Sequence, residues 1–169
     1  MKLLRAQKKD LISIMSIIKD AQELLASQNT DQWQNGYPNN EIILKDIQNK
    51  ESFVLISAFG TCVATAMFST KNEPTYSKIE GRWMNPKQTT YGVIHRMAVA
   101  KNFRGQGMAK FFFNQCERKL SEKKIPSMRI DTHKDNFGMQ KLLKTLGYSY
   151  CGVIYLENGD KRLAFEKLI

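Results

Sequence analysis

The clearest pattern of hydrophobic and polar residues lies in residues 92–124. Apolar residues dominate residues 93–99, and a short apolar run without proline predicts a strand. Further on, apolar side chains recur at spacings of three and four, which predicts an amphipathic helix. The residues on its buried face are Ala109, Phe112, Phe113, Cys116 and Leu120. This strand, the turn after it and the helix are the part of the chain around which the other elements are expected to assemble.

The residues before this stretch predict one strand, two helices and a hairpin. The first strand is expected over residues 2–8, and Asp10 is expected to cap a helix that extends to Leu25. Asn39 or Asn40 caps a shorter helix. Strands over residues 52–58 and 62–69 are expected to pair as a hairpin. Residues 71–90 are polar, and only part of them could form a further strand.

The residues after it predict a strand over residues 128–132, a short helix, and a final hairpin. Gly147 lies where a left-handed helix C-cap is expected. Strands over residues 148–156 and 161–167 flank Asn158-Gly159, a strong hairpin signal. The alternation of strands and helices, with hairpins at both ends, predicts a mixed, largely antiparallel central sheet flanked by helices. The length of 169 residues fits a single domain over residues 1–169.

The turn between the central strand and helix carries the candidate binding chemistry. Gly105 and Gly107 allow the backbone to approach a ligand closely, and the first amides of the helix point toward it. Together with Arg104 they favour an anion such as a phosphate or pyrophosphate. The turn contains neither GxGxxG nor a Walker GK[ST] sequence. The alternative is a glycine-containing strand-to-helix turn that binds nothing.

The spacing Arg-x-x-Gly-x-Ala at Arg104, Gly107 and Ala109, between an apolar strand and an amphipathic helix, resembles the acetyl-CoA loop of the GNAT N-acetyltransferases. The resemblance continues through a strand, Asn136, and a short helix that ends in Gly147-Tyr148. It covers essentially the whole chain and is strongest over residues 94–148. It implies the GNAT acyl-CoA N-acyltransferase fold.

The resemblance also implies transfer of an acetyl group from acetyl-CoA to a primary amine of an unidentified small molecule or peptide, without a metal. The residues that would bind acetyl-CoA are Met97, Ala98, Val99, Arg104, Gly105, Gln106, Gly107, Met108, Ala109 and Asn136. Leu143 stands where many family members carry a tyrosine that protonates the departing sulfur. The sequence therefore leaves the general acid open among Tyr148, Tyr155, Tyr91 and solvent. The lost tyrosine also suits a second function, a CoA-binding regulatory module.

Two histidines are candidates for the base that deprotonates the amine. His95 lies on the central strand, two residues before Met97, and some GNAT enzymes place a histidine there. Histidine titrates near neutral pH, as a general base requires. His133 is the second candidate, and either histidine could instead be structural. Arg96 is expected to orient an acidic group of the substrate or to pair with Asp131.

Two large aromatic residues stand out in the polar segment of residues 27–40. Trp33 and Tyr37 lie among glutamine, asparagine and glycine. Aromatic side chains in such a loop either cap the edge of the core or form the wall of a substrate pocket. We predict that this pair contacts the acceptor amine.

Composition and charge limit the remaining function classes. The net charge of +10 would suit an acidic partner, but its lysines are scattered and no helix-turn-helix, RNP or zinc-finger pattern accompanies them, so no nucleic-acid partner is expected. No segment resembles a signal peptide or a membrane span, which predicts a cytoplasmic protein without a membrane partner. The three cysteines form no CxxC pair and are expected to be buried thiols. The sequence leaves open whether the chain is a homodimer.

Overall fold

The computed structural model describes residues 1–87 and 90–169. The chain forms two compact units, which are described separately. The first comprises Met1–Phe68 and His95–Gln115, and the second comprises Ser69–Ile94 and Cys116–Ile169. Strand β5 (Gly92–Val99) and helix α3 (Met108–Glu122) each run through both units. That the whole chain acts as one domain stays a prediction.

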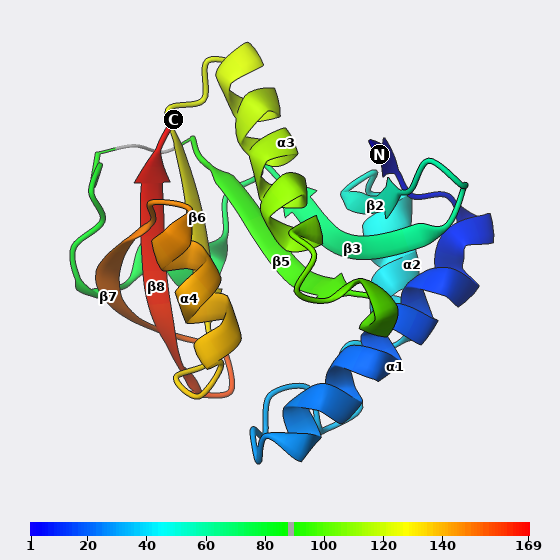
Figure 1. Ribbon diagram of the computed structural model, residues 1–169. Coiled ribbons are helices and arrows are strands. Elements are labelled where there is room, and N and C mark those ends of the chain that lie inside the picture. The colour runs from blue at the N-terminus through cyan, green and yellow to red at the C-terminus, as the bar shows by residue number, and fades with distance from the viewer. Residues whose placement is uncertain (88–89) are drawn as a thin grey trace. The chain divides into compact units, whose positions relative to one another are not determined.

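The first unit combines an antiparallel sheet with two helices and the later half of β5. Its hydrogen-bonded strand order is β1-β2-β3-β5, and β1 and β3 both run antiparallel to β2. The elements are β1 (Lys2–Arg5), η1 (Lys8–Asp10), α1 (Leu11–Ser27), α2 (Asn40–Gln48), β2 (Ser52–Ile56), β3 (Cys62–Ser69) and η3 (Lys101–Phe103). A buried cluster joins α1 and α2 to β2, and Figure 1 shows both helices (blue and cyan) beside this part of the sheet. It contains Ala6, Ile14, Ile18, Ile43 and Val54.

Local interactions of side chains explain how the helices of this unit begin. Asn39 rather than Asn40 caps α2, because its Oδ1 accepts a hydrogen bond from the Ile42 amide at 3.1 Å. Asp10 occupies the N-cap position of α1, but its carboxylate accepts from the Gln7 amide at 2.7 Å and makes no cap to α1. The predicted first strand ends at Arg5 because a short 3-10 helix follows it.

The second unit contains the rest of the sheet. Its strand order is β5-β6-β8-β7-β4, in which β5 and β6 are parallel and the other pairs are antiparallel. The elements are η2 (Pro74–Ser77), β4 (Glu80–Gly81), β6 (Ser127–Thr132), α4 (Phe137–Thr145), β7 (Ser149–Tyr155) and β8 (Lys161–Leu168). Figure 1 shows α4 (orange) on the near face of β6, β8 and β7. The predicted mixed, largely antiparallel sheet flanked by helices is confirmed.

Helix α4 ends at the predicted glycine. Gly147 has a φ of 83°, the left-handed conformation that glycine adopts without strain. The Gly147 amide donates to the Lys144 carbonyl and the Tyr148 amide to the Leu143 carbonyl, at 3.1 and 3.0 Å. These two bonds are those of a Schellman motif, and they satisfy carbonyls that a helix end would otherwise leave unpaired.

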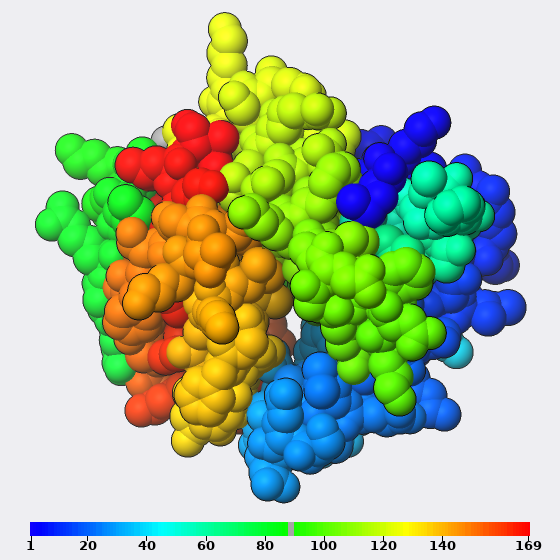
Figure 2. Space-filling view, viewed as in Figure 1, coloured from blue at the N-terminus to red at the C-terminus, as the bar shows by residue number. Residues whose placement is uncertain are grey.

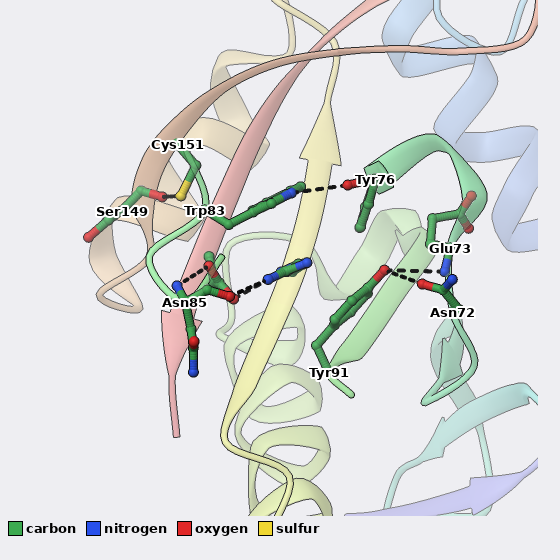
Figure 3. A network of polar contacts seen from close by, with 10 residues as sticks. Asn72, Glu73, Tyr76, Trp83, Asn85, Tyr91, Ser149 and Cys151 are labelled. Atoms are coloured by element: carbon green, nitrogen blue, oxygen red, sulfur yellow. Dashed lines mark hydrogen bonds and ion pairs between the residues drawn. The ribbon is translucent and has the colours of Figure 1, made fainter. Parts of the chain in front are cut away.

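The polar segment before β5 is built around a buried arginine. Arg129 on β6 lies between the rings of Trp83 and Tyr91, with its guanidinium carbon 4.5 and 4.2 Å from their centroids. Its Nε donates to Glu166 on β8 at 2.9 Å. Figure 3 shows Trp83 bonded to the Tyr76 carbonyl, and Tyr91 bonded to both the Asn72 side chain and the Glu73 amide. Aromatic rings and one buried ion pair therefore fix a segment that its polar composition left unassigned. Gln88 and Thr89 of this segment lie outside the described residues.

Candidate functional site

The turn between β5 and α3 has the backbone conformation that its glycines predict. Gly105 and Gly107 have φ values of 74° and 80°, which favour glycine over any residue with a side chain. A Cβ atom built at either position would meet nothing within 4 Å. The glycines therefore serve the path of the backbone and leave open space beside it. In Figure 2, residues 100–110 (green to lime) are exposed on the viewed face.

Arg104 presents a guanidinium group at this turn. Its Nε donates to the Val99 carbonyl at 3.2 Å, which ties the turn to the end of β5. Its Nη2 is buried and has no hydrogen-bond partner among the described residues. A buried cationic nitrogen without a partner is costly, because it loses water and gains nothing in exchange. An anion bound here would supply that partner.

The first turn of α3 adds backbone donors to the same place. The helix begins at Met108, directly after Gly107, and the first amides of an α-helix have no partner within the helix. The Gly107 carbonyl already accepts from the Phe111 amide at 2.9 Å. The Gln106 side chain folds back onto the Asn102 carbonyl at 2.8 Å. That Arg104 and the amides after Gly107 bind a phosphate group stays a prediction, which the helix start and the cationic side chain support.

Strand β5 departs from regular geometry at Arg96, which has a φ of 56°. A non-glycine residue in this region costs of the order of 1–3 kcal/mol and persists where the surroundings fix it. Three hydrogen bonds hold the Arg96 guanidinium. Its Nε and Nη2 each donate to Asp46 of α2 at 2.9 Å, and its Nη1 donates to the Tyr37 hydroxyl at 2.7 Å. The structure therefore gives Arg96 a different acidic partner from the predicted Asp131.

Asp46 was not predicted as a site residue. Burial raises the pKa of its carboxyl group, while the charge and hydrogen bonds of Arg96 and, more weakly, the charge of His95 oppose this rise. We expect the carboxylate to stay charged at neutral pH because the guanidinium is bound at both of its oxygens. The spacing held a signal, since Asp46 follows the buried Ile43 by three residues and so shares its helix face. An acidic residue on a buried helix face needs a cationic partner.

Two glutamines, one on helix α1 and one in the loop, hold the predicted substrate loop in place. Gln22 of α1 donates to the carbonyls of Tyr37 and Pro38 at 3.0 and 3.4 Å, and Gln34 donates to the Gln22 carbonyl at 3.0 Å. Trp33 is half-buried and Tyr37 is 38% exposed. The loop is therefore anchored to α1 in the first unit, with Tyr37 at its surface. That these two residues contact an amine stays a prediction.

The structure brings most of the predicted residues together in one unit. His95, Arg96, the backbone of Met97 to Val99, the turn at Arg104 and the Tyr37 loop all belong to the first unit. The Ala100 amide donates to the Val63 carbonyl at 3.0 Å, which holds the end of β5 against β3. Asn136 belongs to the second unit, where its Oδ1 caps α4 by accepting from the Met139 amide at 3.0 Å. The cap shows a structural role, and its contact with a cosubstrate stays a prediction.

The remaining candidates for acid and base lie in the second unit. Nδ1 of His133 accepts from the Asp135 amide at 3.2 Å just before α4. Tyr148 donates to Glu117 at 3.0 Å, and burial followed by the Glu117 charge raises the pKa of this phenol. Tyr155 is exposed and donates to Glu80 at 2.7 Å, a bond that raises the pKa of its phenol. Leu143 occupies the position at which the resemblance implies a tyrosine in many relatives, and it is fully buried.

The cysteines give no sign of a reactive thiol. Cys116 and Cys151 are buried as predicted, but Cys62 is half-exposed. Burial raises the pKa of Cys62 to about 11, with a smaller contribution from Asp10. A thiol reacts as its thiolate, so a raised pKa slows alkylation at neutral pH.

We predict that iodoacetamide modifies Cys62 of the native protein at pH 8 about a hundredfold more slowly than an ordinary thiol of pKa near 8.5. The rate should rise about tenfold per pH unit up to pH 10, because the thiolate fraction does. Mass spectrometry of timed samples measures this, and the urea-unfolded chain provides the reference rate. A native rate that stops rising below pH 9 contradicts the prediction.

Metal-binding groups and membrane-spanning helices are both absent from the described residues. Within residues 1–87 and 90–169, no three histidine, cysteine or acidic side chains gather where they could hold a metal ion. None of the helices described over the same residues is long and apolar enough to cross a membrane.

Comparison with known proteins adds a family and a fold. The sequence model of the acetyltransferase (GNAT) family matches residues 18–148. A GNAT-family acetyltransferase of Streptococcus agalactiae is 34% identical, with 99% of this chain and 95% of that chain covered and a TM-score of 0.89. A second one, from Listeria monocytogenes, is 17% identical with 99% and 94% coverage and a TM-score of 0.76, which shows likeness of fold alone. So does a ribosomal-protein-alanine N-acetyltransferase from Brucella melitensis, at 18% identity, full coverage of both chains and a TM-score of 0.69.

Proposed function

Because the chain belongs to the GNAT acetyltransferase family, we propose that it transfers an acetyl group from acetyl-CoA to a primary amine of a small molecule or peptide. The amine would attack directly while both substrates are bound. The observation that carries this proposal is the turn from Arg104 to Ala109. It joins two left-handed glycines, the start of a helix and a buried guanidinium nitrogen that lacks a partner among the described residues. These features support a pyrophosphate site.

The likeness to the GNAT family implies a role for each of the candidate binding residues. Arg104 and the amides after Gly107 would hold the pyrophosphate of CoA, and backbone groups of Met97 to Val99 would pair with its pantetheine arm. Asn136 would contact either the pantetheine or the neighbouring segment of the polypeptide. A backbone amide would polarise the acetyl carbonyl, which prepares it for attack. The bound thioester supplies the acetyl group, and the protein supplies position and proton transfer.

Proton handling distinguishes this chain within the proposed mechanism. An amine attacks only when it is neutral, and His95 of β5 would take its proton directly or through a water molecule. No tyrosine stands at position 143 to protonate the sulfur that departs. A thiol has a pKa near 8.5, so the sulfur can leave as a thiolate at neutral pH without a dedicated acid. We therefore assign one protein group, His95, to the chemical step.

Leu143 also favours a second candidate function. A fully buried leucine cannot donate a proton, which suits a module that binds CoA and regulates without efficient catalysis. Thiol release from acetyl-CoA separates the two, measured against amines, polyamines, amino acids and peptides. Release with at least one amine supports the enzyme. Binding of acetyl-CoA by calorimetry without release from any of them supports the module.

We predict that Gly107→Glu weakens acetyl-CoA binding at least about a hundredfold, the effect of losing roughly 3 kcal/mol. The carboxylate would enter the proposed pyrophosphate site and repel it. Isothermal titration calorimetry measures the dissociation constant. The protein should stay folded, because the added side chain meets open space and the strain of a left-handed residue is about 1–2 kcal/mol.

Gly60→Glu is the matched control for this variant. Gly60 has a φ of 81°, also faces open space, and belongs to the same unit, in the turn between β2 and β3. It should cost the same strain and add the same charge while leaving acetyl-CoA binding unchanged. Equal dissociation constants for Gly107→Glu and the unchanged protein would remove the turn from the proposed site.

A further inference from the structure

The contacts of Arg96 suggest a role in the first unit that differs from direct binding of an acidic substrate. Its Nε and Nη2 edge is occupied by Asp46, with two hydrogen bonds of 2.9 Å. The side chains of Arg96 and Asp46 are only 12% and 9% exposed. A carboxylate of a substrate cannot pair with an edge that a buried carboxylate already fills. The Nε and Nη2 groups therefore fix the position of the Arg96 side chain through Asp46.

The third contact of Arg96 makes the Tyr37 hydroxyl oxygen a hydrogen-bond acceptor. Nη1 of Arg96 donates to this hydroxyl at 2.7 Å. A tyrosine hydroxyl has one proton and can accept as well as donate. Its oxygen accepts from Arg96, which leaves its own proton to be donated elsewhere. No acceptor for this proton is found among the described residues. The side chain is 38% exposed, so a ligand can reach it.

Two hydrogen bonds within the first unit anchor Tyr37. Gln22 holds its backbone carbonyl at 3.0 Å, and Arg96 holds its hydroxyl. A hydroxyl that accepts from a cation is polarised and becomes a stronger donor. The strained backbone of Arg96, with its φ of 56°, places this arrangement one residue from Met97. Non-glycine residues in such conformations cluster at functional sites.

We propose that Asp46 and Arg96 are positioning residues that aim the Tyr37 hydroxyl as a hydrogen-bond donor at an oxygen atom of the acceptor amine. This inference rests on the proposed function and narrows its substrate class. The acceptor would be an amine that carries a carbonyl or carboxylate oxygen, as amino acids, their amides and peptides do. Simple alkylamines and polyamines carry no such oxygen, and they would leave the phenol proton without a partner.

Paired amines test the proposal without requiring turnover. L-leucinamide and isopentylamine differ by a carboxamide group, as do L-phenylalaninamide and phenethylamine. Calorimetry gives the dissociation constant of each amine with the protein, with and without CoA. We expect the carbonyl-bearing member to bind about tenfold more tightly, as one hydrogen bond to a fixed donor provides. Tyr37→Phe should abolish this preference and leave the binding of the alkylamine and of acetyl-CoA unchanged.

The positioning residues have a separate readout. Arg96→Lys keeps the charge but not the fork, and Asp46→Asn keeps the shape but not the charge. Each should reduce the preference for the carbonyl-bearing amine, and adding Tyr37→Phe to either should reduce it no further than Tyr37→Phe alone. Tyr155→Phe is the control, because it removes an exposed phenol of the second unit whose partner is Glu80. It should leave the preference intact.

Each outcome decides for or against the proposal. Failure of every carbonyl-bearing amine to bind, or an equal loss for both members of a pair with Tyr37→Phe, overturns it. So does a loss in the double variants that equals the sum of the single losses. Failure of the proposed function looks different, because acetyl-CoA would then not bind or no thiol would be released. The ratio of the two amine dissociation constants depends neither on acetyl-CoA binding nor on thiol release.

Discussion

Replacing Glu166 by leucine is expected to lower the free energy of unfolding by about 3–5 kcal/mol. Glu166 and Arg129 face each other directly across β8 and β6 and are joined at 2.9 Å. Their side chains are 0% and 4% exposed. Without the carboxylate, the guanidinium stays buried with its charge uncompensated, and that penalty exceeds the value of the lost bond itself.

The other contacts that the described residues make with Arg129 are uncharged. Its Nη2 donates to the Asn85 carbonyl at 2.9 Å, and its flat faces lie against Trp83 and Tyr91. The Asn85 amide in turn donates to Glu166 at 3.2 Å. Removing Glu166 therefore also leaves the Asn85 backbone amide without its acceptor, and the polar segment before β5 loses one of its hydrogen bonds to the sheet.

Urea denaturation followed by circular dichroism measures the effect. Glu157→Leu is the control, because it removes the same charge from an exposed turn and should change the stability by less than about 0.5 kcal/mol. The double variant Arg129→Met with Glu166→Leu should regain most of the loss, since apolar replacement of a whole buried pair is often neutral. A loss below about 1 kcal/mol for Glu166→Leu, or no recovery in the double variant, contradicts this explanation.

The arginine cluster shows what sequence patterns cannot provide. The sequence predicted a strand over residues 128–132, which the structure places at Ser127–Thr132. Gly147 and Asn158-Gly159 mark turns through local conformational rules. The partner of Arg129 depends on the register of two strands that lie 37 residues apart. Register follows from packing across the whole sheet, so no local pattern encodes it.

In the candidate site, too, local features were predictable and long-range contacts were not. The turn at Arg104, Gly105 and Gly107 was predictable because its conformation and chemistry are local to a few residues. The left-handed backbone of Arg96 was not predictable, since alternation along a strand assumes regular geometry at every residue. Its partner Asp46 lies 50 residues away in the sequence. Contacts of this kind require the fold, and they changed Arg96 from a candidate substrate ligand into a residue that holds Tyr37.

His95→Ala is expected to lower kcat/KM near pH 7 by about 10²–10⁴-fold, the usual contribution of a general base. His95 is half-buried on β5 and belongs to the same unit as the buried Asp46 of α2. It would take the proton from an amine whose ordinary pKa, like that of the α-amino group of a peptide, is about 7.7–8.0. At neutral pH most of such an amine is protonated, so the reaction depends on a group that can accept the proton.

The pH dependence separates a catalytic from a structural imidazole. As the pH rises from 6 to 9, the neutral amine becomes abundant and the loss caused by His95→Ala should shrink. A structural defect would reduce the rate by a similar factor at each pH. His95→Gln, which keeps a polar side chain of similar size, should restore the stability but not the rate, and the dissociation constant of acetyl-CoA should stay unchanged in both variants.

The chain provides its own control in its second histidine. His133 accepts a backbone hydrogen bond from Asp135 just before α4, so His133→Ala should lower the melting temperature and leave the pH profile of kcat/KM in place. Thiol release from acetyl-CoA, measured with one accepted amine at each pH, gives both profiles. Near-normal turnover of His95→Ala from pH 6 to 9 would remove His95 from the mechanism. Amine deprotonation would then fall to His133 if the His133→Ala variant loses its titration, and otherwise to solvent, in which case the rate of the unchanged protein should rise with pH in proportion to the neutral amine.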